Sequence, residues 1–527
     1  MRFVFALVIV MVTGFISLSY EILWYRSYSF VSGSAPAVFG LLLGSFLLGL
    51  ALGAFGGRVF CHDRTSTGDP TQLRRLGAFI ALANLTGYLV VPALAAVATR
   101  GHWALSFPLV TLSAALFGAT LPVISHFGIA PDKLVGARLS YLYLANIIGS
   151  AAGSFLTGFV LLDRMTLPGC ALLLVLLGMA LATLLLVAGA VPARRRASLI
   201  LLVAAAVGLV LWVTPAAYHR VYEKLLYKGY YSDDHGFRHV VETRSGVVTV
   251  SRWGAVFGGG AYDGRISTDL VDDHNAIVRA HVIAALHPKP RRVLMIGLAT
   301  GAWAHVLAQM PRVESLTVVE IDPGYLQLIT RYPEVSGLVR NPRARIIIDD
   351  GRRWLARHPE ETFDAIVMNT TWHWRAHVTN LLSREYLMLI RRHLRPGGIY
   401  HFNATSSDDA LYTAFTVFPY GLRFRNFATV SDQPIQVDGE RWREVLKEFT
   451  IDGRRVFDLT QPEGRAQVER IVALVNTLDA PIPKRVAFER RESVLSRIQG
   501  ARVITDDNMV PEWQRIFEYV WIPREER

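Results

Sequence analysis

Cysteine is nearly absent from this sequence, and its scarcity excludes two kinds of site. The 527 residues include two cysteines, Cys61 and Cys170, both in or beside apolar segments. Two such residues cannot form a disulfide framework or a cysteine-ligated metal centre, and we expect no metal. A cleavage motif is also missing, because the first apolar run, residues 3–18, continues into the bulky segment Tyr20–Arg26. We therefore expect no cleavable signal peptide.

Charged residues are scarce as well, but only in the first 215 residues. Leu, Ala, Gly, Val and Phe dominate this part, and a span needs roughly 20 mostly apolar residues. About seven candidate spans are expected, at 3–24, 36–60, 76–98, 103–128, 138–162, 167–191 and 198–215. The sequence therefore predicts a multi-pass α-helical membrane bundle over residues 1–215, with the lipid bilayer as a partner.

The net charge of +12 has two interpretations, nucleic-acid binding or membrane topology. Arginine clusters such as Arg194–Arg196 lie between apolar runs, where they mark topology or meet lipid headgroups. The membrane interpretation is favoured, and we expect no nucleic-acid partner.

Two features of the spans suggest how the bundle is built. Glycines recur in the second and fifth spans, where small residues let helices approach closely: Gly40, Gly44, Gly49, Gly53, Gly57, Gly149, Gly153 and Gly158. Glu21 and Arg26 flank the end of the first span. An ionisable residue at membrane depth suggests function, but near an interface a structural pair or an anchor is favoured over a substrate site.

The remaining chain has the composition of a soluble α/β protein. We expect a linker and a small β-subdomain at 216–290, with strands over 235–270 and a helix over 272–286. A Rossmann-like core at 291–405 follows, then a C-terminal part at 406–527. Its strands are expected at 293–297, 316–322, 345–348, 365–368 and 399–402, its helices at 302–310, 323–331, 351–357 and 383–393, and a turn at 394–398. This alternation predicts a doubly wound, largely parallel sheet.

The ends of these strands carry the side chains that a nucleoside cofactor needs. Gly297 and Gly301 shape the first loop. Glu320 can accept hydrogen bonds from both ribose hydroxyls, and Asp350, which precedes Gly351, can accept one from an amine of the base. The alternatives are an ordinary tight turn and a solvated strand end. The loop has no Lys-Ser/Thr pair, so S-adenosylmethionine fits better than a polyphosphate cofactor.

The chain resembles the spermidine synthase (polyamine aminopropyltransferase) superfamily over residues 240–405, and most closely its membrane-fused bacterial branch. The resemblance rests on motifs in the core, with weaker matches at both ends: Val319–Asp322, Asp350-Gly351 with Trp354-Leu355, Asp364–Val367, Leu381–Tyr386, Leu394–Gly398, Glu21-x-x-Trp24-x-Arg26, and Thr505–Asn508 with Glu512. It implies that Gly297, Gly301, Glu320, Asp350 and Gly351 bind S-adenosylmethionine, its decarboxylated form or methylthioadenosine. A homodimer is also implied.

Most departures from the family pattern lie after the fourth core strand, and one lies upstream of the core. Asn369 occupies the position of the family's catalytic aspartate, and an amide cannot accept the proton of the attacking amine. A general base is worth roughly 10²–10⁴ in rate. Trp372 replaces a second acid, and Arg375 adds positive charge where a polyamine needs negative charge. The family's Tyr-His-Glu run, which lies upstream of the core, has no clear counterpart, although Asp272–Asn275 lies in that part of the sequence.

His373 and His377 are the candidates for a replacement base. They lie four residues apart and would share one face of a helix. A histidine near its ordinary pKa is a good general base, but a pair of structural histidines is an equally good interpretation. Trp372 and Trp374 could line a site for an apolar substrate, or simply pack against the helical bundle.

Three functions remain open. The first is a membrane-anchored S-adenosylmethionine-type transferase with a non-standard small-molecule acceptor, either an amine or a molecule from the membrane. The second is a genuine polyamine aminopropyltransferase that uses other acids, such as Asp272, Asp273 or Asp349. The third is a non-catalytic sensing or transport module with a degenerate synthase domain.

The side of the membrane is ambiguous. Ten basic residues lie on one side of seven spans, against three on the other: Arg2, Arg58, Arg64, Arg74, Arg75, Lys133, Arg138 and Arg194–Arg196, against Arg26, Arg100 and Arg164. The charge rule places the first set in the cytoplasm and the soluble domain outside. Adenosyl cofactors are cytoplasmic, so we expect a bacterial inner-membrane protein with its soluble domain in the cytoplasm.

Overall fold

The computed structural model describes residues 3–61, 70–130, 132–189, 193–369, 372–478 and 487–508, together with residue 512. The chain divides into two compact units. The first includes Met1–Gly236 and Glu242–Arg244, and the second includes Phe237–Val241 and Ser245–Ile516. Each unit is described by itself below.

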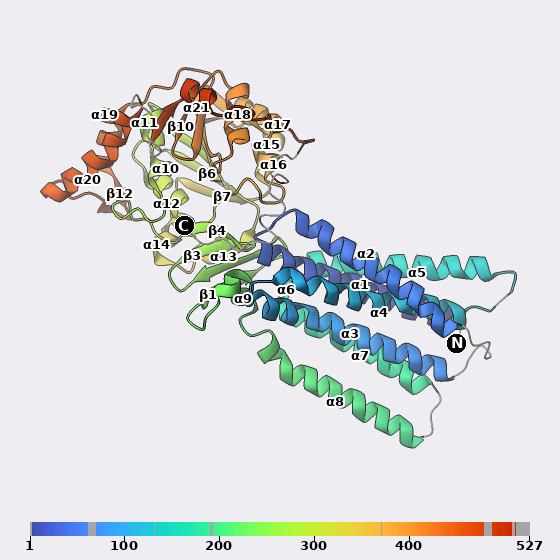
Figure 1. Ribbon diagram of the computed structural model, residues 1–527. Coiled ribbons are helices and arrows are strands. Elements are labelled where there is room, and N and C mark those ends of the chain that lie inside the picture. The colour runs from blue at the N-terminus through green and yellow to red at the C-terminus, as the bar shows by residue number, and fades with distance from the viewer. Residues whose placement is uncertain are drawn as a thin grey trace. The chain divides into compact units, whose positions relative to one another are not determined.

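The first unit is a helical bundle, coloured blue to green in Figure 1. Within its described residues, seven helical segments are long and apolar enough to cross a membrane. They are built from α1 (Phe3–Ser32), α2 (Ala37–Gly57), α3 (Pro70–Ala98), α4 (Phe107–Gly128), α5 (Val135–Leu156), α7 (Leu167–Ala188) and α8 (Ala193–Ala217). After α5 the chain continues through a π-helical turn, Thr157–Leu161, into α6 (Leu162–Arg164). The predicted bundle of seven apolar helices is confirmed.

Glycines bring two pairs of helices into backbone contact. A Cβ added at Gly53 of α2 would lie 1.9 Å from the Ala115 carbonyl oxygen of α4, and one at Gly149 of α5 would lie 1.9 Å from the Met11 oxygen of α1. No larger residue fits at these two positions, as the small-residue pattern predicts. The prediction is wrong for Gly40, Gly44 and Gly158, where a Cβ would meet nothing within 4 Å.

Glu21 and Arg26 do not form a pair with each other. The Arg26 guanidinium donates to the Thr243 carbonyl oxygen and lies 3.8 Å from the Glu242 carboxylate. Glu242 also accepts hydrogen bonds from the Tyr222 hydroxyl at 2.9 Å and from the first backbone N–H of α7 at 2.8 Å. Arg26 therefore anchors the end of α1 to residues that lie more than 200 positions later in the chain.

The second unit begins with a small four-stranded sheet. Its strands are β1 (Phe237–Glu242), β2 (Val247–Ser251), β3 (Ala255–Gly258) and β4 (Ala261–Arg265), in that spatial order. β2 pairs with β3, and β3 with β4, in antiparallel fashion. The expected small β-subdomain is therefore present.

The single helix expected over 272–286 is wrong. Helix begins only at α10 (Val278–His281) and continues as α11 (Ile283–Leu286). The Asp273 carboxylate accepts hydrogen bonds from the backbone N–H groups of Ile277 and Val278, at 2.6 and 2.9 Å. A side chain that bonds its own backbone competes with helix formation, so the chain turns before the helix starts.

An eight-stranded sheet forms the centre of this unit. Its spatial order is β14-β10-β11-β9-β8-β5-β6-β7. The parallel strands are β5 (Arg292–Ile296), β6 (Ser315–Glu320), β7 (Ala344–Ile348), β8 (Phe363–Met368) and β9 (Leu394–Asn403), and the antiparallel extension is β10 (Tyr420–Phe424), β11 (Phe427–Ser431) and β14 (Phe488–Arg490). The strand order reverses between β5 and β8, and ligands bind outside the carboxyl ends at such a point.

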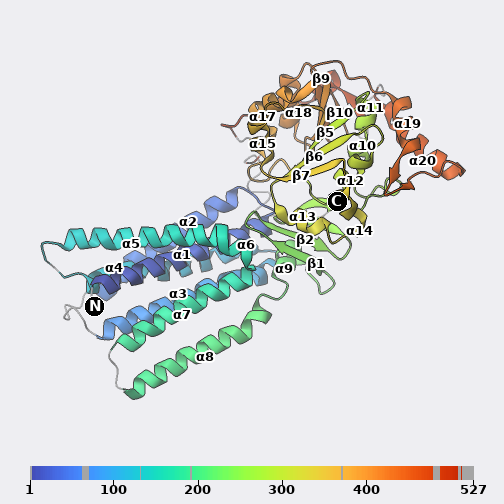
Figure 2. The same ribbon diagram turned by 180° about the vertical axis from the view of Figure 1, so that it is seen from behind.

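Helices cover both faces of the parallel part, as the two opposite views in Figures 1 and 2 allow the reader to follow. Val293 and Met295 of β5 join one hydrophobic core with residues of α12 (Ala302–Gln309). Leu294 and Ile296 join the other, with residues of α15 (Gly351–Arg357) and α17 (Arg384–Arg392). Successive side chains of a strand point to opposite faces, so a central strand between two helical layers must be apolar throughout.

The turn expected at 394–398 is part of β9. Phe363 pairs with Leu394, but Ala365 pairs with Ile399, so the register shifts between them. The extra residues are accommodated inside the strand, where Gly397 adopts a positive φ of 77°. A Pro-Gly-Gly sequence predicts a turn, yet here it forms an irregularity within an otherwise parallel strand.

Candidate functional site

The loop after β5 contains two glycines that differ in their surroundings: one has a close side-chain neighbour, and the other has open space beside it. Gly297, Ala299 and Gly301 all have positive φ angles, of 89°, 47° and 75°. A Cβ at Gly301 would lie 2.8 Å from the Ile329 side chain, whereas a Cβ at Gly297 would meet nothing within 4 Å. Gly301 is thus needed for the turn into α12, and the space above Gly297 is open to a ligand.

Glu320 ends β6 and holds this loop in place. Its two carboxylate oxygens accept hydrogen bonds from the Leu298 N–H at 2.6 Å and the Asp322 N–H at 2.8 Å. The side chain is only 4 % exposed, so Glu320 is not a solvated strand end. Burial raises its pKa to about 7, although the two backbone N–H groups lower it. Each oxygen keeps a second lone pair that can accept a hydrogen bond from a hydroxyl group.

Asp350 and Gly351 lie at the end of the neighbouring strand. Ile348 at the end of β7 pairs with Glu320 of β6, which places the two acidic positions at one edge of the sheet. One Asp350 oxygen accepts from the Arg353 N–H at 2.7 Å and caps α15. A Cβ at Gly351 would lie 2.8 Å from the Ile296 side chain, so α15 packs closely against the end of β5. The topology therefore gathers the five expected cofactor residues at the ends of three adjacent strands.

Asn369 follows β8 and belongs to a chain of side-chain amides. Its Oδ1 accepts a hydrogen bond from Asn403 Nδ2 at 3.0 Å, and Asn403 Oδ1 accepts from Asn426 Nδ2 at 2.7 Å. Asn426 in turn accepts from the Arg279 guanidinium at 2.8 Å. Along these described hydrogen bonds, the position of the family's base is bordered by neutral amides and by the Arg279 guanidinium. Residues 370–371 of the departing run lie outside the described residues.

The two histidines do not share a helical face, because residues 372–378 form turns rather than a helix. His373 Nδ1 lies 3.0 Å from the Thr405 carbonyl oxygen and 3.1 Å from its hydroxyl. A carbonyl oxygen can only accept, so Nδ1 donates the hydrogen bond to it. His377 is exposed and has a positive φ of 67°. The structure therefore separates the histidines that the spacing placed together.

Arg375 does not present an unbalanced positive charge. Its guanidinium lies 3.4 Å from the Asp263 carboxylate and donates to the Gly258 carbonyl oxygen at 2.9 Å. The Tyr325 hydroxyl also donates to Asp263. Burial and the charge of Asp263 raise the pKa of Tyr325, which keeps its hydroxyl protonated as a donor. Asp263 and Tyr325 are not predicted from the sequence, because a single acid in a strand gives no signal of its distant partners.

Trp372 and Trp374 stack on each other within the same loop. Their ring centroids are 5.9 Å apart, with 26° between the ring planes. Trp374 is buried, whereas Trp372 is partly exposed. The loop thus presents an aromatic surface beside the neutralised Arg375.

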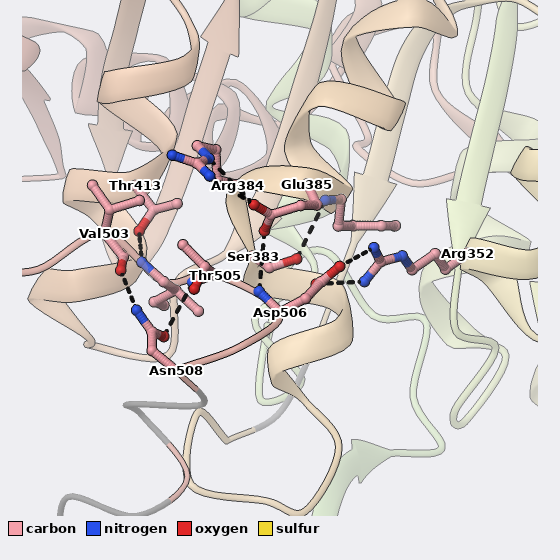
Figure 3. Close-up of polar contacts among 11 residues, drawn as sticks. Arg352, Ser383, Arg384, Glu385, Thr413, Val503, Thr505, Asp506 and Asn508 are labelled. Carbon is pink, nitrogen blue, oxygen red and sulfur yellow. Dashed lines mark hydrogen bonds and ion pairs between the residues drawn. The ribbon is translucent and has the colours of Figure 1, made fainter.

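The tail segment, residues 502–508, binds α15 and α17 through the contacts drawn in Figure 3. The Asp506 carboxylate accepts two hydrogen bonds from the Arg352 guanidinium, at 2.6 and 2.8 Å. Its backbone N–H donates to the Glu385 carboxylate at 3.0 Å. Asn508 closes the segment on itself by donating to the Val503 carbonyl oxygen at 2.8 Å. The tail motif is therefore attached to the helix that Asp350 caps.

Glu512 holds the loop that contains His373 and Arg375. Its carboxylate oxygens accept from the backbone N–H groups of His377 at 3.0 Å and Thr379 at 2.9 Å. The side chain is 2 % exposed. Because both donors belong to backbone at the start of α16 (Thr379–Leu382), Glu512 fixes the path of the chain there without contributing to its chemistry.

Residues 274–414 match the family model described as "Spermine/spermidine synthase domain". The chain carries a spermidine-synthase-like domain. The predicted resemblance to this superfamily is confirmed, and the bundle of apolar helices agrees with its membrane-fused form.

Curated relatives match about a third of the chain. A polyamine aminopropyltransferase from Desulforudis audaxviator is 33 % identical over 162 residues, which is 30 % of this chain and 53 % of the relative. Polyamine aminopropyltransferase 1 from Pseudomonas aeruginosa is 33 % identical over 189 residues, or 34 % of this chain and 63 % of that protein. The chain thus spans about half the length of the first of these relatives.

Two solved structures are also similar to part of this chain. The spermidine synthase of Thermotoga maritima is 17 % identical, with a TM-score of 0.34, and the match covers 41 % of this chain and 79 % of that chain. A spermidine synthase in complex with the transition-state analogue AdoDATO is 19 % identical, with a TM-score of 0.36, and the match covers 45 % and 88 % of the two chains.

Proposed function

We propose that this chain is a membrane-anchored, spermidine-synthase-like transferase. It binds S-adenosylmethionine or a related adenosyl thioether and transfers a group to a non-standard acceptor. The observation that carries the proposal is the contrast within one site. Acidic groups suited to a nucleoside lie at the ends of β6 and β7, while an amide occupies the base position after β8.

The residues at the first three strand ends fit an adenosyl group. The remaining lone pairs of the buried Glu320 carboxylate accept the ribose hydroxyls, and the second oxygen of Asp350 accepts the base amine. The open face at Gly297 leaves room for the sugar and the sulfur. When bound, a sulfonium cofactor supplies an electrophilic carbon next to its charged sulfur.

The acceptor side favours a molecule that is not a polycation. Arg375 neutralises Asp263, and the chain of amides from Asn369 ends in Arg279. Neither group attracts several ammonium charges. His373 Nε2 is the best-placed proton acceptor on the loop, beside the aromatic surface of Trp372. The acceptor is therefore a small neutral or membrane-derived molecule.

Calorimetry on the purified full chain tests this proposal. The probes are S-adenosylmethionine, decarboxylated S-adenosylmethionine and methylthioadenosine, each titrated separately. We expect binding of methylthioadenosine and of at least one sulfonium compound. A chain that binds none of the three is not a transferase of this type. Binding without any turnover would favour a sensing or transport module instead.

The alternative is a genuine polyamine aminopropyltransferase, which the curated relatives favour. Asn369→Asp distinguishes the two, since it restores a carboxylate at the position of the family's base. If the missing base is what prevents aminopropyl transfer, release of methylthioadenosine from decarboxylated S-adenosylmethionine and putrescine rises by about 10²-fold or more. Efficient transfer by the unmodified chain would instead establish the alternative.

We further propose that the soluble domain lies in the cytoplasm of a bacterial cell, where adenosyl cofactors occur. The loop charges oppose this placement. Protease added to sealed inner-membrane vesicles of known orientation tests it directly. Cleavage of the soluble domain in inside-out vesicles, and protection in right-side-out vesicles, is the expected result. The reverse pattern would refute the placement.

A further inference from the structure

The hydrogen-bonded amides at the position of the family's base have a direction, because they begin at a group that can only donate. The Arg279 guanidinium donates to Asn426 Oδ1 at 2.8 Å, and a guanidinium has no acceptor. Asn426 must therefore present its Oδ1 to Arg279. Its Nδ2 then donates to Asn403 Oδ1 at 2.7 Å. The Asn426 amide thus has only one orientation that bonds both of its neighbours.

A second donor fixes the Asn403 amide independently. Asn403 Oδ1 also accepts from the Thr405 backbone N–H at 2.8 Å, and a backbone N–H can only donate. Asn403 Nδ2 is therefore the group that faces Asn369, and it donates to Asn369 Oδ1 at 3.0 Å. Both donors give the same direction, in which each amide accepts with its oxygen and donates onward with its nitrogen. We call Arg279, Asn426, Asn403 and Asn369 the amide chain.

Asn369 Nδ2 is the donor end of the amide chain. Among the residues that the structure describes, no hydrogen bond uses Nδ2, and the side chain is partly exposed. Asn369 directly follows β8, and the strand order reverses between β5 and β8, which is where ligands bind in such a sheet. This position therefore presents N–H groups to a ligand, whereas a carboxylate there would present lone pairs.

Arg279 places a positive charge at the head of the amide chain. Its guanidinium carbon lies 5.6 Å from the Trp303 ring centroid and 5.5 Å from that of Phe427. Burial, and after it the like charge of Arg425, lowers the pKa of Arg279 to about 10, which leaves it charged at neutral pH. A charged donor polarises the hydrogen bonds that follow it in the same direction. The N–H groups of Asn369 are therefore stronger donors than those of an isolated amide.

The amide chain is also linked to His373. Thr405, whose N–H bonds Asn403, accepts a hydrogen bond from His373 Nδ1 at its carbonyl oxygen, at 3.0 Å. Thr405 and Ser406 have positive φ angles of 54° and 60°, a strained conformation for residues other than glycine. Such strain persists only where surrounding bonds fix the backbone, and it is common at functional sites. One network therefore holds both the donor end of the amide chain and the candidate base.

We propose that Asn369 Nδ2 binds a carboxylate oxygen of the acceptor. The proposal rests on the proposed transferase and narrows its acceptor to a small molecule that carries a carboxylate. A carboxylate offers only lone pairs, whereas an ammonium group offers only N–H donors and would leave one donor facing another at Asn369. A site built around one hydrogen-bonding group rejects an analogue that lacks the matching group. A zwitterionic amino acid has the required carboxylate and no net charge, so it agrees with a small neutral acceptor.

Two compounds of four carbon atoms test the proposal, because 4-aminobutyrate carries an amine and a carboxylate while putrescine carries two amines. Each is titrated by calorimetry into the full chain after saturation with methylthioadenosine. We expect 4-aminobutyrate to bind at least tenfold more tightly than putrescine. Equal affinities, tighter binding of putrescine, or binding of neither compound would overturn the proposal. Methylthioadenosine binding is measured first, and its absence would refute the transferase and this proposal together.

Asn369→Asp should reverse the preference, since the new carboxylate accepts from an ammonium group and repels another carboxylate. Putrescine should then bind at least tenfold more tightly than 4-aminobutyrate. Asn380→Asp is the matched control, because it makes the same change at an exposed side chain of α16 and should leave the preference as it was. An unchanged preference in Asn369→Asp, or an equal change in the control, would refute recognition at Asn369.

Asn426→Asp tests the direction of the amide chain without touching its donor end. The acid still accepts from Arg279 but has no N–H for Asn403, so the polarisation from Arg279 is interrupted. The preference for 4-aminobutyrate should shrink at least threefold, while methylthioadenosine affinity stays the same and shows that the variant is folded. A preference equal to that of the unmodified chain would overturn the role of the amide chain in strengthening the Asn369 donor.

Discussion

The two sides of the candidate site are built in different ways. The nucleoside side consists of glycine turns, a helix cap and one carboxylate, and most of its contacts join residues within about 25 positions of each other. On the acceptor side, Asn369 bonds to Asn403, Arg375 to Asp263, and His377 to Glu512. The acceptor side can therefore change its chemistry residue by residue, while the strand ends proposed to hold the cofactor keep their shape.

Glu320→Ala should have the largest effect on the nucleoside side. It removes the acceptor for two ribose hydroxyls and also frees the Leu298 N–H, so methylthioadenosine affinity should fall by roughly 100-fold or more. Calorimetry measures the loss, and Glu320→Gln, which keeps the shape and one acceptor, should lose less. An affinity within twofold of the unmodified chain would disprove the ribose assignment.

His373→Ala should separate the two sides. If Nε2 of His373 accepts the acceptor's proton, turnover falls by roughly 10²-fold while methylthioadenosine affinity stays the same. His377→Ala is the matched control, since this exposed side chain should leave both quantities unchanged. The measurements are single-turnover rates and calorimetric affinities. Equal losses in the two variants would remove His373 from the proposed chemistry.

The pH dependence of binding should be confined to the nucleoside side. Burial raises the pKa of Glu320 to about 7, and the ionised carboxylate is the better acceptor for hydroxyl groups. Methylthioadenosine affinity should therefore rise several-fold between pH 6 and 8, both about one unit from that pKa. Glu320→Gln should abolish the dependence. A pH dependence that survives in this variant would have to come from another group.

The same pKa also affects stability, with a definite sign. Between the ordinary value near 4.5 and about 7, the folded protein keeps a proton that the unfolded chain has lost. The contribution of Glu320 to stability is therefore fully present below about pH 4.5 and is lost as the pH rises through 7. Glu320→Gln should flatten this part of the stability curve, measured by thermal unfolding.

Asp506→Asn should have the smallest effect. It weakens the pair with Arg352, which is partly exposed, and such pairs are worth up to about 1 kcal/mol. Hydrogen exchange in the tail segment should quicken by up to about fivefold, the rate equivalent of that energy, with methylthioadenosine affinity within about threefold. A tenfold loss of affinity would mean that the tail shapes the nucleoside side more than its contacts indicate.

The sequence predicted best what depends on near neighbours. The glycine loop, the β6 and β7 ends and the apolar helices follow from patterns within 20 to 30 residues. The helix over 272–286 was wrong because the Asp273 side chain bonds its own backbone, and the turn at 394–398 was wrong because β9 accommodates the extra residues. Partners such as Arg26 with Glu242, or Arg375 with Asp263, lie more than 100 positions apart. No single-sequence pattern specifies which of many charges such a side chain meets.

Glu512 follows the backbone that it holds by more than 130 residues, and this separation sets an order on biosynthesis. Because a ribosome synthesises the protein from its N-terminus, the apolar helices and the parallel strands β5 to β9 can form before residue 512 has been made. The backbone N–H groups of His377 and Thr379 can be bonded by the Glu512 carboxylate only after it has been synthesised, more than 130 residues later. The loop that contains His373 and Arg375 therefore matures late, so incomplete chains would not yet have a finished acceptor side.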